Sequence, residues 1–331
     1  MSAIDFDKLF HDLTKVKVAV VGDVMLDTYW WGNVERISPE APVPVVAVSK
    51  KEQRIGGAGN VALNIASLGA SVSMLSVLGK DEDGEQLTKL LQDNNINTKY
   101  LVNSEQRITT NKIRIISRNQ HMMRLDAEMA ADMSAADAER LLYAFENYIA
   151  AESPSIVILE DYNKGVLTEN VISRIVALCK KQNILTAVDP KRKNFFAYEG
   201  VDIFKPNLKE IKEGLNILKD DVNISVLKDM HLQLQEKLKH RISLITLSEK
   251  GVFYQQENNS EIIPTHIRSI ADVSGAGDTV IAIASLVFAA TADARLMAEM
   301  ANIAGGLVCE EVGTVAIDRS KLLDECKKLL S

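Results

Sequence analysis

The amino-acid sequence predicts an α/β protein with a doubly wound, mostly parallel sheet and helices on both faces. Two observations support this prediction. From residue 72 onward, short runs rich in β-branched residues alternate with longer amphipathic runs, as in repeated strand–helix units. Polar side chains also follow several strand-like runs directly, and open α/β sheets bind ligands at the carboxyl ends of their strands. The 331 residues suffice for one large α/β domain or two ordinary ones.

The chain begins with a short amphipathic segment at residues 4–13, which we expect to be helical. Residues 16–21 form a continuous β-rich run, and such runs suit a strand buried on both faces of a parallel sheet. Asp27 follows this strand closely. A carboxylate there is well placed for ligand hydroxyls, although an ordinary turn aspartate is the alternative.

Two segments, near residues 28–50 and 105–126, do not fit the strand–helix alternation. The first contains Pro39, Pro42 and Pro44, which forbid a helix and disfavour a central strand. In the second, Ile113 and Ile115 alternate with basic residues. We expect an edge strand or a protruding lid. The alternative is a peripheral hairpin that covers the edge of the main sheet.

The glycine-rich stretch 56–59 precedes an amphipathic run that we expect to be a helix. Gly57, Gly59 and Ala62 also match a dinucleotide-binding fingerprint, so an oxidoreductase is a rival interpretation. That fingerprint requires an immediate strand-to-helix turn. Here the strand-like run stops near Val48 and a polar stretch follows, which disfavours dinucleotide binding.

The remaining pattern indicates further strands and helices. We expect strands at 72–77, 155–159, 184–188, 202–204 and 242–247, and helices at 84–94, 134–150, 168–182, 207–214, 222–240, 278–290, 293–310 and 318–330. Polar clusters at 160–165, 189–192 and 205–210 follow three of the strands. Individually each suits a solvated loop, but together they favour one shared crevice.

The stretch from Asp272 to Thr279 has the composition of an anion-binding turn. Gly275 and Gly277 allow successive N–H groups to point into one concavity, and the following helix adds its positive N-terminal end. Such a nest can hold the charge of a phosphoryl group in transfer. Asp278 beside it is placed to act as a general base. The alternative is a helix N-cap aspartate after a glycine turn.

Asn207 and Glu210 are spaced so that both side chains lie on one face of the first turn of a helix. Their side-chain oxygens are of the kind that Mg²⁺ prefers. A capping box has the same geometry, and both roles are compatible.

Composition limits the classes of function. The formal net charge of −7 argues against a general nucleic-acid or anionic-membrane binder. The three cysteines and five histidines are widely spaced, which indicates reduced thiols and no structural metal. The chain shows no hydrophobic signal region and no apolar run of the roughly 18 residues needed to cross a membrane. A cytoplasmic protein is the default expectation.

Two motifs resemble a known family. Residues 272–279 resemble the C-terminal signature of the ribokinase-like (PfkB) carbohydrate kinases, in which an aspartate and two variable residues precede Gly-Ala-Gly-Asp. Residues 56–69 are similar to the N-terminal glycine signature of that family. Two signatures in the right order are far more specific than either alone, and the resemblance spans nearly the whole chain.

This resemblance implies direct in-line phosphoryl transfer from MgATP to a sugar hydroxyl. It implies that Asp278 is the base and that Gly275, Ala276 and Gly277 hold the developing charge. The acceptor-binding residues that we expect are Asp27, Gly57, Asn60, Arg118, Asp161, Lys164 and Lys191. The nucleotide-binding residues that we expect are Asn207, Glu210, Thr246, Ser248, Glu249, Gly251 and Asn302, with Glu210 holding Mg²⁺ through water. Val312 to Thr314 resembles a loop that helps to bind a monovalent cation in some relatives.

Within the family, residues 22–27, 36–46, 117–120, 124–126 and 161–165 resemble the kinases of D-glycero-D-manno-heptose 7-phosphate. The resemblance implies phosphorylation at O1 to the 1,7-bisphosphate, towards the ADP-heptose of the lipopolysaccharide core. An acceptor that already carries a phosphate needs a cationic grip. The candidates are Lys112, Arg114, Arg118, Arg124, Lys164, Lys191 and Arg192, and we expect Arg118 and Lys191 to be among those that reach the phosphate.

We expect one ribokinase-like domain over residues 1–331, with the two lid segments inserted and no nucleotidyltransferase domain of the kind that follows in bifunctional relatives. We also expect a homodimer formed through the lid. The rivals are a kinase for another acceptor, such as a fructose phosphate, ribose or a nucleoside, and a non-catalytic family member. A non-catalytic member would be expected to have lost Asp278 or a glycine of the nest, and neither is lost.

Overall fold

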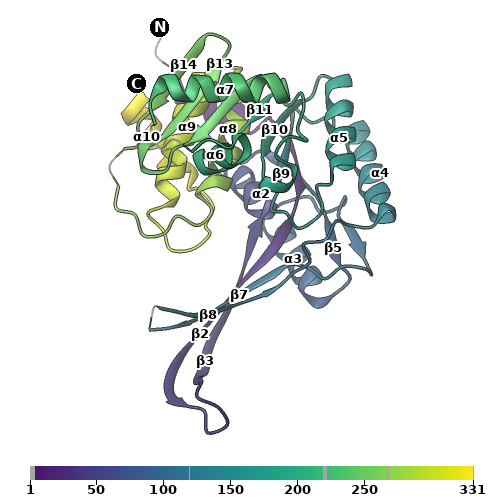
Figure 1. Cartoon of the computed structure of the whole chain (residues 1–331), viewed down its shortest axis with the longest axis vertical. Helices are drawn as coiled ribbons and strands as arrows, with labels where there is room; N and C mark the ends of the chain where they lie inside the picture. Colours follow the sequence, from purple (N-terminus) through teal and green to yellow (C-terminus); the bar gives the residue numbers. More distant parts are fainter. Residues whose placement is uncertain (1–3, 119, 219–221, 267, 331) are drawn as a thin grey trace.

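The computed structural model describes residues 4–118, 120–218, 222–266 and 268–330 (Figure 1). Their main feature is an eight-stranded sheet, in which six neighbouring strands are parallel and two at one edge are antiparallel. In spatial order the strands are β14 (Asn259–Ile263), β13 (Val252–Gln256), β12 (Ile242–Thr246), β11 (Ile203–Phe204), β10 (Leu185–Asp189), β9 (Ile156–Glu160), β1 (Lys17–Gly22) and β4 (Ser71–Leu75). The predicted mostly parallel sheet is confirmed.

Helices cover both faces of this sheet, because successive residues of the buried strands face opposite sides. In β1, Val18 and Val20 pack into one core and Ala19 and Val21 into the other. The first core contains residues of α1 (Phe6–Leu13), α2 (Ala58–Ser67), α3 (Glu82–Asp93), α8 (Ala276–Thr291), α9 (Ala294–Val308) and α10 (Arg319–Leu330). The second contains residues of α4 (Ala135–Glu152), α5 (Glu169–Lys181), α6 (Leu208–Leu215) and α7 (Ile224–Leu238).

The predicted lid is a separate four-stranded sheet that projects from the α/β body as a long arm (Figure 1). Its strands, in spatial order, are β3 (Pro44–Gly57), β2 (Val24–Ile37), β7 (Asn111–Ser117) and β8 (Gln120–Ala127). Pro39 and Pro42 lie in the turn between β2 and β3, and Pro44 is the first residue of an edge strand. The prolines therefore occupy positions that need no ladder hydrogen bond.

The lid strands are longer than predicted, and this corrects one argument. Residues 49–54 do not separate a strand from the glycine stretch, because β3 continues through them to Gly57 and α2 begins at Ala58. The stated reason for disfavouring a dinucleotide site was therefore wrong. The topology supplies a better reason to disfavour a dinucleotide site. Strand β3 pairs antiparallel with β2, whereas the fingerprint belongs to a parallel strand–helix–strand unit.

Other differences from the prediction are local. The predicted strand 72–77 divides into β4 and β5 (Val77–Gly79), and β5 pairs with β6 (Val102–Ser104). The two strands at one side of the sheet, β13 and β14, were not predicted, because their apolar runs are only three and two residues long. Within the described ranges, no helix combines the length and the apolar character needed to cross a membrane.

A buried carboxylate connects the end of β1 to a loop that follows β9. Asp23 is 1% exposed, and its Oδ2 accepts hydrogen bonds from the backbone N–H groups of Tyr162 (2.8 Å) and Lys164 (3.0 Å). Its Oδ1 accepts one from Val166 (3.0 Å). Three backbone donors therefore depend on one side chain, which fixes the loop 161–166 above the carboxyl edge of the sheet.

We predict that Asp23→Asn lowers the free energy of unfolding by about 2–4 kcal/mol, because an amide has only one acceptor oxygen and leaves a buried N–H unpaired. Urea denaturation measures this loss. Asp12→Asn is the control, because Asp12 is exposed and pairs with Lys15 on the surface. Equal midpoints for the two variants would contradict the role of Asp23.

Candidate active site

The residues of the predicted anion nest lie at the N-terminus of α8. Gly275 is the N-cap of the helix and has a φ of +78°, in the left-handed region that favours glycine. A Cβ atom at this position would lie 2.7 Å from Nδ2 of Asn60. Asp278 is the third residue of the helix and not its cap, so the N-cap interpretation of Asp278 was wrong. Its side chain does not cap the helix and can take part in the site.

Two side chains hold the carboxylate of Asp278. Oδ2 accepts a hydrogen bond from Nδ2 of Asn60 on α2 (2.8 Å), and Oδ1 accepts one from the hydroxyl of Tyr162 (2.6 Å). Burial raises the pKa of Asp278 to about 6, although both hydrogen bonds act to lower it. At neutral pH the group is therefore ionised and still has a pKa suited to accepting a proton.

Asp278 belongs to a buried group of three carboxyl groups. Glu160 ends β9 and Asp189 ends β10, in direct register, and one oxygen of each of the three residues lies within 4.8 Å of the others. Neither carboxylate oxygen of Glu160 has a hydrogen-bond partner. Burial, Asp189 and Asp278 raise the pKa of Glu160 well above its ordinary value, which favours its neutral form.

Two lysines balance this group. Nζ of the buried Lys205 lies 2.8 Å from Oδ2 of Asp189, and Nζ of Lys191 lies 3.3 Å from Oδ1. Burial acts to raise the pKa of Asp189, but the two lysines hold it below its ordinary value. Both lysines line the same cavity as Gly277, and Nζ of Lys205 lies 3.8 Å from the position of a Cβ at Gly277. Phosphate oxygens are suitable ligands for such a pair.

This cavity has a volume of about 730 Å³. It extends from Tyr162 and the nest along the ends of β10 and β12 to α9. Six of the seven predicted nucleotide-binding residues line it, namely Asn207, Thr246, Ser248, Glu249, Gly251 and Asn302. The seventh, Glu210, reaches it indirectly, because its Oε1 accepts a hydrogen bond from Lys191 (3.0 Å).

The capping box predicted for Asn207 and Glu210 is present. The Asn207 side chain accepts a hydrogen bond from the backbone of Glu210, and Oε2 of Glu210 accepts one from the backbone of Asn207 (both 2.8 Å). Each carboxylate oxygen of Glu210 thus has one protein partner and keeps lone pairs for water. These remaining lone pairs suit the water shell of a hydrated Mg²⁺ ion.

Three predicted acceptor-binding residues lie at the base of the lid. Asp27, on β2, is 4% exposed and forms an ion pair with Nη1 of Arg114 (2.5 Å). Oδ2 of Asp27 lies 2.4 Å from the position of a Cβ at Gly56, so only glycine fits there. Gly57 precedes α2 with a φ of +58°, and Asn60 lies on the first turn of α2, against Asp278.

The structure does not bring three other predicted residues into this group. Asp161 is buried and accepts hydrogen bonds from the hydroxyl of Tyr198 and the backbone of Asn163 (both 2.7 Å). Lys164 pairs with Glu128 (2.7 Å). Arg118 is exposed at the turn between β7 and β8, six residues beyond the residue that pairs with Asp27. A separation of six strand residues is about 20 Å.

Sequence reasoning missed four residues of this site: Glu160, Tyr162, Asp189 and Lys205. Each of them follows or ends a strand of the parallel sheet. Their position at the carboxyl ends of strands could have indicated these residues. It predicted the crevice, but it did not show which of the polar side chains there belong to the site. Lys191 was expected to bind the acceptor, but it lines the same cavity as the nucleotide-binding candidates.

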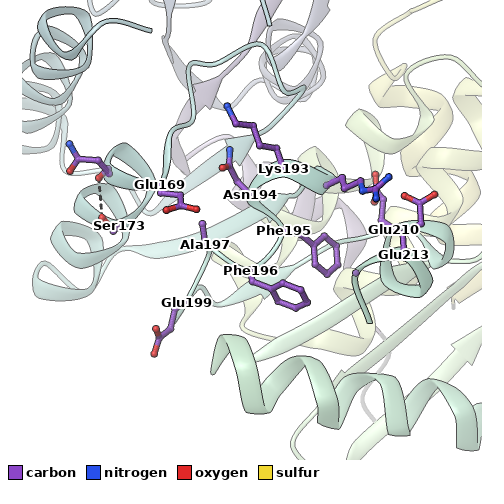
Figure 2. Close-up of a pocket in the computed structure, with 13 residues that line it drawn as sticks. Glu169, Ser173, Lys193, Asn194, Phe195, Phe196, Ala197, Glu199, Glu210 and Glu213 are labelled. Carbon is purple, nitrogen blue, oxygen red and sulfur yellow. Dashed lines mark hydrogen bonds between the residues drawn. The ribbon is translucent and has the colours of Figure 1, made fainter. Parts of the chain in front are cut away.

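A second cavity, of about 770 Å³, opens beside α5 and α6 (Figure 2). Phe195, Phe196 and Asn194 line it, and Glu210 and Glu213 lie at its other side. Its lining contains no residue of the nest. Of these two cavities, only the first is lined by the nest, by Asp189 and Asp278, and by both lysines, so we place the candidate active site there.

Comparison with known proteins agrees with this chemistry. Residues 15–321 match the pfkB family carbohydrate kinase profile. The chain is 39% identical over 308 residues to the "Bifunctional protein HldE" of Sulfurimonas denitrificans and 40% identical over 304 residues to that of Aliarcobacter butzleri. The matches cover 92% and 91% of this chain but only 63% and 62% of those proteins. The chain thus spans less than two thirds of the length of these relatives.

Solved structures show the same fold. Phosphofructokinase-2 from Escherichia coli in complex with potassium has a TM-score of 0.79 at 19% identity, and the match covers 96% of this chain and 100% of that chain. Arabidopsis thaliana ribokinase complexed with ribose and ATP has a TM-score of 0.72 at 17% identity, covering 93% and 99%. The fold is ribokinase-like, and the chain belongs to the pfkB family of carbohydrate kinases.

Proposed function

We propose that this chain transfers the γ-phosphoryl group of ATP to O1 of D-glycero-D-manno-heptose 7-phosphate and forms the 1,7-bisphosphate. The observation that carries phosphoryl transfer to a hydroxyl is the position of Asp278, a buried carboxylate with a pKa of about 6 beside an anion nest. Similarity to bifunctional HldE proteins over more than nine tenths of the chain supports the heptose phosphate as the acceptor.

The residues of the site have separate tasks in this mechanism. Asp278 accepts the proton of the attacking hydroxyl, while Asn60 and Tyr162 hold its two oxygens in place. The N-terminal amides of α8, from Gly275 to Gly277, stabilise the charge that develops on the phosphoryl group. Lys191 and Lys205, which line the same cavity, contact the phosphates.

The nucleotide occupies the part of the cavity between β12 and α9, lined by Thr246, Ser248, Glu249, Gly251 and Asn302. Glu210 and Asn207 hold hydrated Mg²⁺ at its phosphate end. The ion, when bound with ATP, neutralises charge on the phosphates and orients them. The crowding of carboxyl groups at this end is otherwise hard to reconcile with binding an anion.

The acceptor lies at the base of the lid, with its hydroxyls against Asp27, Gly57 and Asn60. Lys112 is the candidate that we favour for the 7-phosphate, because it lies opposite Asp27 in the strand register, is half-buried and lies 5.7 Å from the ring centre of Tyr162. Arg114 of the same strand is already paired with Asp27. Burial lowers the pKa of Lys112, and a bound phosphate dianion reverses that effect.

We propose that the chain forms a homodimer through the lid. Large apolar side chains are exposed along the lid strands and their connecting turn, and they are Ile37, Val43, Val48, Met122, Met123 and Leu125. An apolar face on a sheet edge is typical of an interface. In such a dimer, Arg118 at the end of β7 serves the acceptor site of the partner subunit or stays in solvent.

A panel of acceptors tests the proposed substrate. With MgATP, we expect ADP release with heptose 7-phosphate and little with fructose 6-phosphate, fructose 1-phosphate, ribose or adenosine. NMR of the product should show phosphorylation at O1. Turnover of another acceptor alone would contradict the substrate but keep the kinase mechanism. ATP binding without turnover of any acceptor would favour a non-catalytic member of the family.

We predict that Asp278→Asn lowers kcat by about 10²–10⁴-fold, the usual contribution of a positioned base, while ATP binding is retained. Steady-state assays and calorimetric titration with ATP measure the two effects. Glu213→Gln is the control, because Glu213 lines the second cavity and has no contact with the nest. Turnover near that of the unmodified enzyme would exclude Asp278 as the base.

We predict that Tyr162→Phe moves the acidic limb of the kcat/KM profile to higher pH by about one unit. The carboxylate of Asp278 is the active form, so activity falls as pH drops through its pKa of about 6. Loss of the Tyr162 hydroxyl removes a hydrogen bond that stabilises this carboxylate, which raises the pKa.

The matched control for this pH shift is Tyr198→Phe, because the Tyr198 hydroxyl donates to another buried carboxylate, Asp161 (2.7 Å). Its acidic limb should stay in place. A profile for Tyr162→Phe that is lower in amplitude but unshifted would show that Tyr162 only shapes the cavity.

A further inference from the structure

One arginine of the lid contacts the loop that follows α9, on the other side of the active site. Arg54 lies near the end of β3, and its Nη1 donates hydrogen bonds to the backbone carbonyl oxygens of Val312 (3.2 Å) and Thr314 (3.4 Å). These partners lie 258 and 260 residues away along the chain. A single guanidinium therefore joins the base of the lid to the C-terminal part of the domain.

The loop 312–314 lies directly against the anion nest. The N–H of Gly313 donates to Oδ2 of Asp272 (2.9 Å), and Oδ1 of Asp272 accepts from the N–H of Ser274 (2.9 Å), just before the nest. On the other side, the Thr314 methyl group lies 3.2 Å from the position of a Cβ at Gly275. A shift of this loop therefore moves the residues that form the nest.

The guanidinium fills the space beside these carbonyl groups. A Cβ at Gly313 would lie 2.6 Å from Nη1 of Arg54, and Gly313 has a φ of +76°. Cζ of Arg54 lies 5.0 Å from the ring centre of Tyr29, and Nε donates to Oε1 of Glu52 (2.7 Å). Aromatic ring, carboxylate and carbonyl groups thus hold the charge in one place.

We propose that the guanidinium of Arg54 takes the place of a monovalent metal ion at this loop, and that the kinase therefore needs no such ion. We call Arg54 in this role a built-in cation. Carbonyl oxygens turned towards one point favour a positive charge, and Arg54 supplies one that is covalently attached. The sequence resemblance suggested a monovalent cation at Val312 to Thr314. The residues present do not fit one, because two of the carbonyl groups already bind Nη1.

Arg54 acts here as a positioning residue, since its contacts reach the nest through Asp272 and Thr314. The predicted effect of Arg54 on enzyme activity rests on the proposed phosphoryl transfer at the nest. The predicted effect on cation binding does not, because it concerns only whether the folded chain responds to a monovalent cation. The two consequences can therefore be measured separately.

The first experiment compares enzyme activity in potassium, sodium and tetramethylammonium buffers of equal ionic strength. We expect the unmodified enzyme to have the same kcat/KM for ATP in all three. Arg54→Ala should lose about tenfold to a hundredfold in tetramethylammonium, the usual effect of losing charged hydrogen bonds. Added potassium or methylguanidinium should restore much of this loss. Activation of the unmodified enzyme by potassium, or full activity of Arg54→Ala without it, would overturn the proposal.

Lys50→Ala is the matched control. Lys50 is also on β3 and pairs with the same Glu52 (2.8 Å), but its side chain is largely exposed. This variant should keep the activity of the unmodified enzyme in every buffer. A loss equal to that of Arg54→Ala would assign the effect to Glu52 and not to the loop, which contradicts the proposal.

The second experiment measures thermal melting in the same three salts and needs no acceptor. The melting temperature of the unmodified chain should not depend on the cation, whereas that of Arg54→Ala should rise in potassium. If no sugar is turned over but this pattern appears, the proposed function fails and the built-in cation stands. If Arg54→Ala does not fold, the melting temperatures of Arg54→Lys and of the unmodified chain are compared in the same salts. Stabilisation of the unmodified chain by potassium would contradict the proposal.

Discussion

The site depends on one buried carboxylate that two distant parts of the chain hold in place. Asp278 comes from the first turn of α8, Asn60 from the first turn of α2 and Tyr162 from the loop after β9. Each oxygen of Asp278 has a fixed donor, so the side chain cannot rotate away from the nest. Because Asp278 and its two partners come from the two signature motifs and from the middle of the chain, the base is correctly placed only when the whole α/β body is folded.

The parallel sheet makes this convergence possible. Glu160 and Asp189 end neighbouring strands in register, and Lys205 follows the next strand, so acidic and basic groups lie together at one edge. The lid extends from the same edge, because β2 begins two residues after β1 ends. Contacts from the lid to the loop 312–314 then connect the acceptor side of the site to the nest.

The sequence was sufficient to predict the sheet, most helices, the lid and the residues of the nest, because each is encoded locally by periodicity, proline or glycine. Tyr162 was beyond such reasoning. Its position depends on Asp23, 139 residues earlier, which binds the backbone of its loop. Asp161, the preceding residue, looked equally suitable in sequence but is turned towards Tyr198. Side-chain direction in a loop depends on contacts that are distant in sequence, and no local pattern records them.

Lysines and a raised pKa limit the negative charge of this acidic cluster. Asp189, Asp278 and Glu210 are acidic, and the ammonium groups of Lys191 and Lys205 lie against Asp189 and Glu210. Ionised Glu160 would add a further negative charge in a place where no donor contacts it, so burial and its acidic neighbours raise its pKa and favour the neutral acid. A proton on Glu160 reduces the negative charge that the phosphates meet, and Mg²⁺ bound with ATP would reduce it further. The lysines and the amides of α8 are then the groups that stabilise the charge of the phosphoryl group.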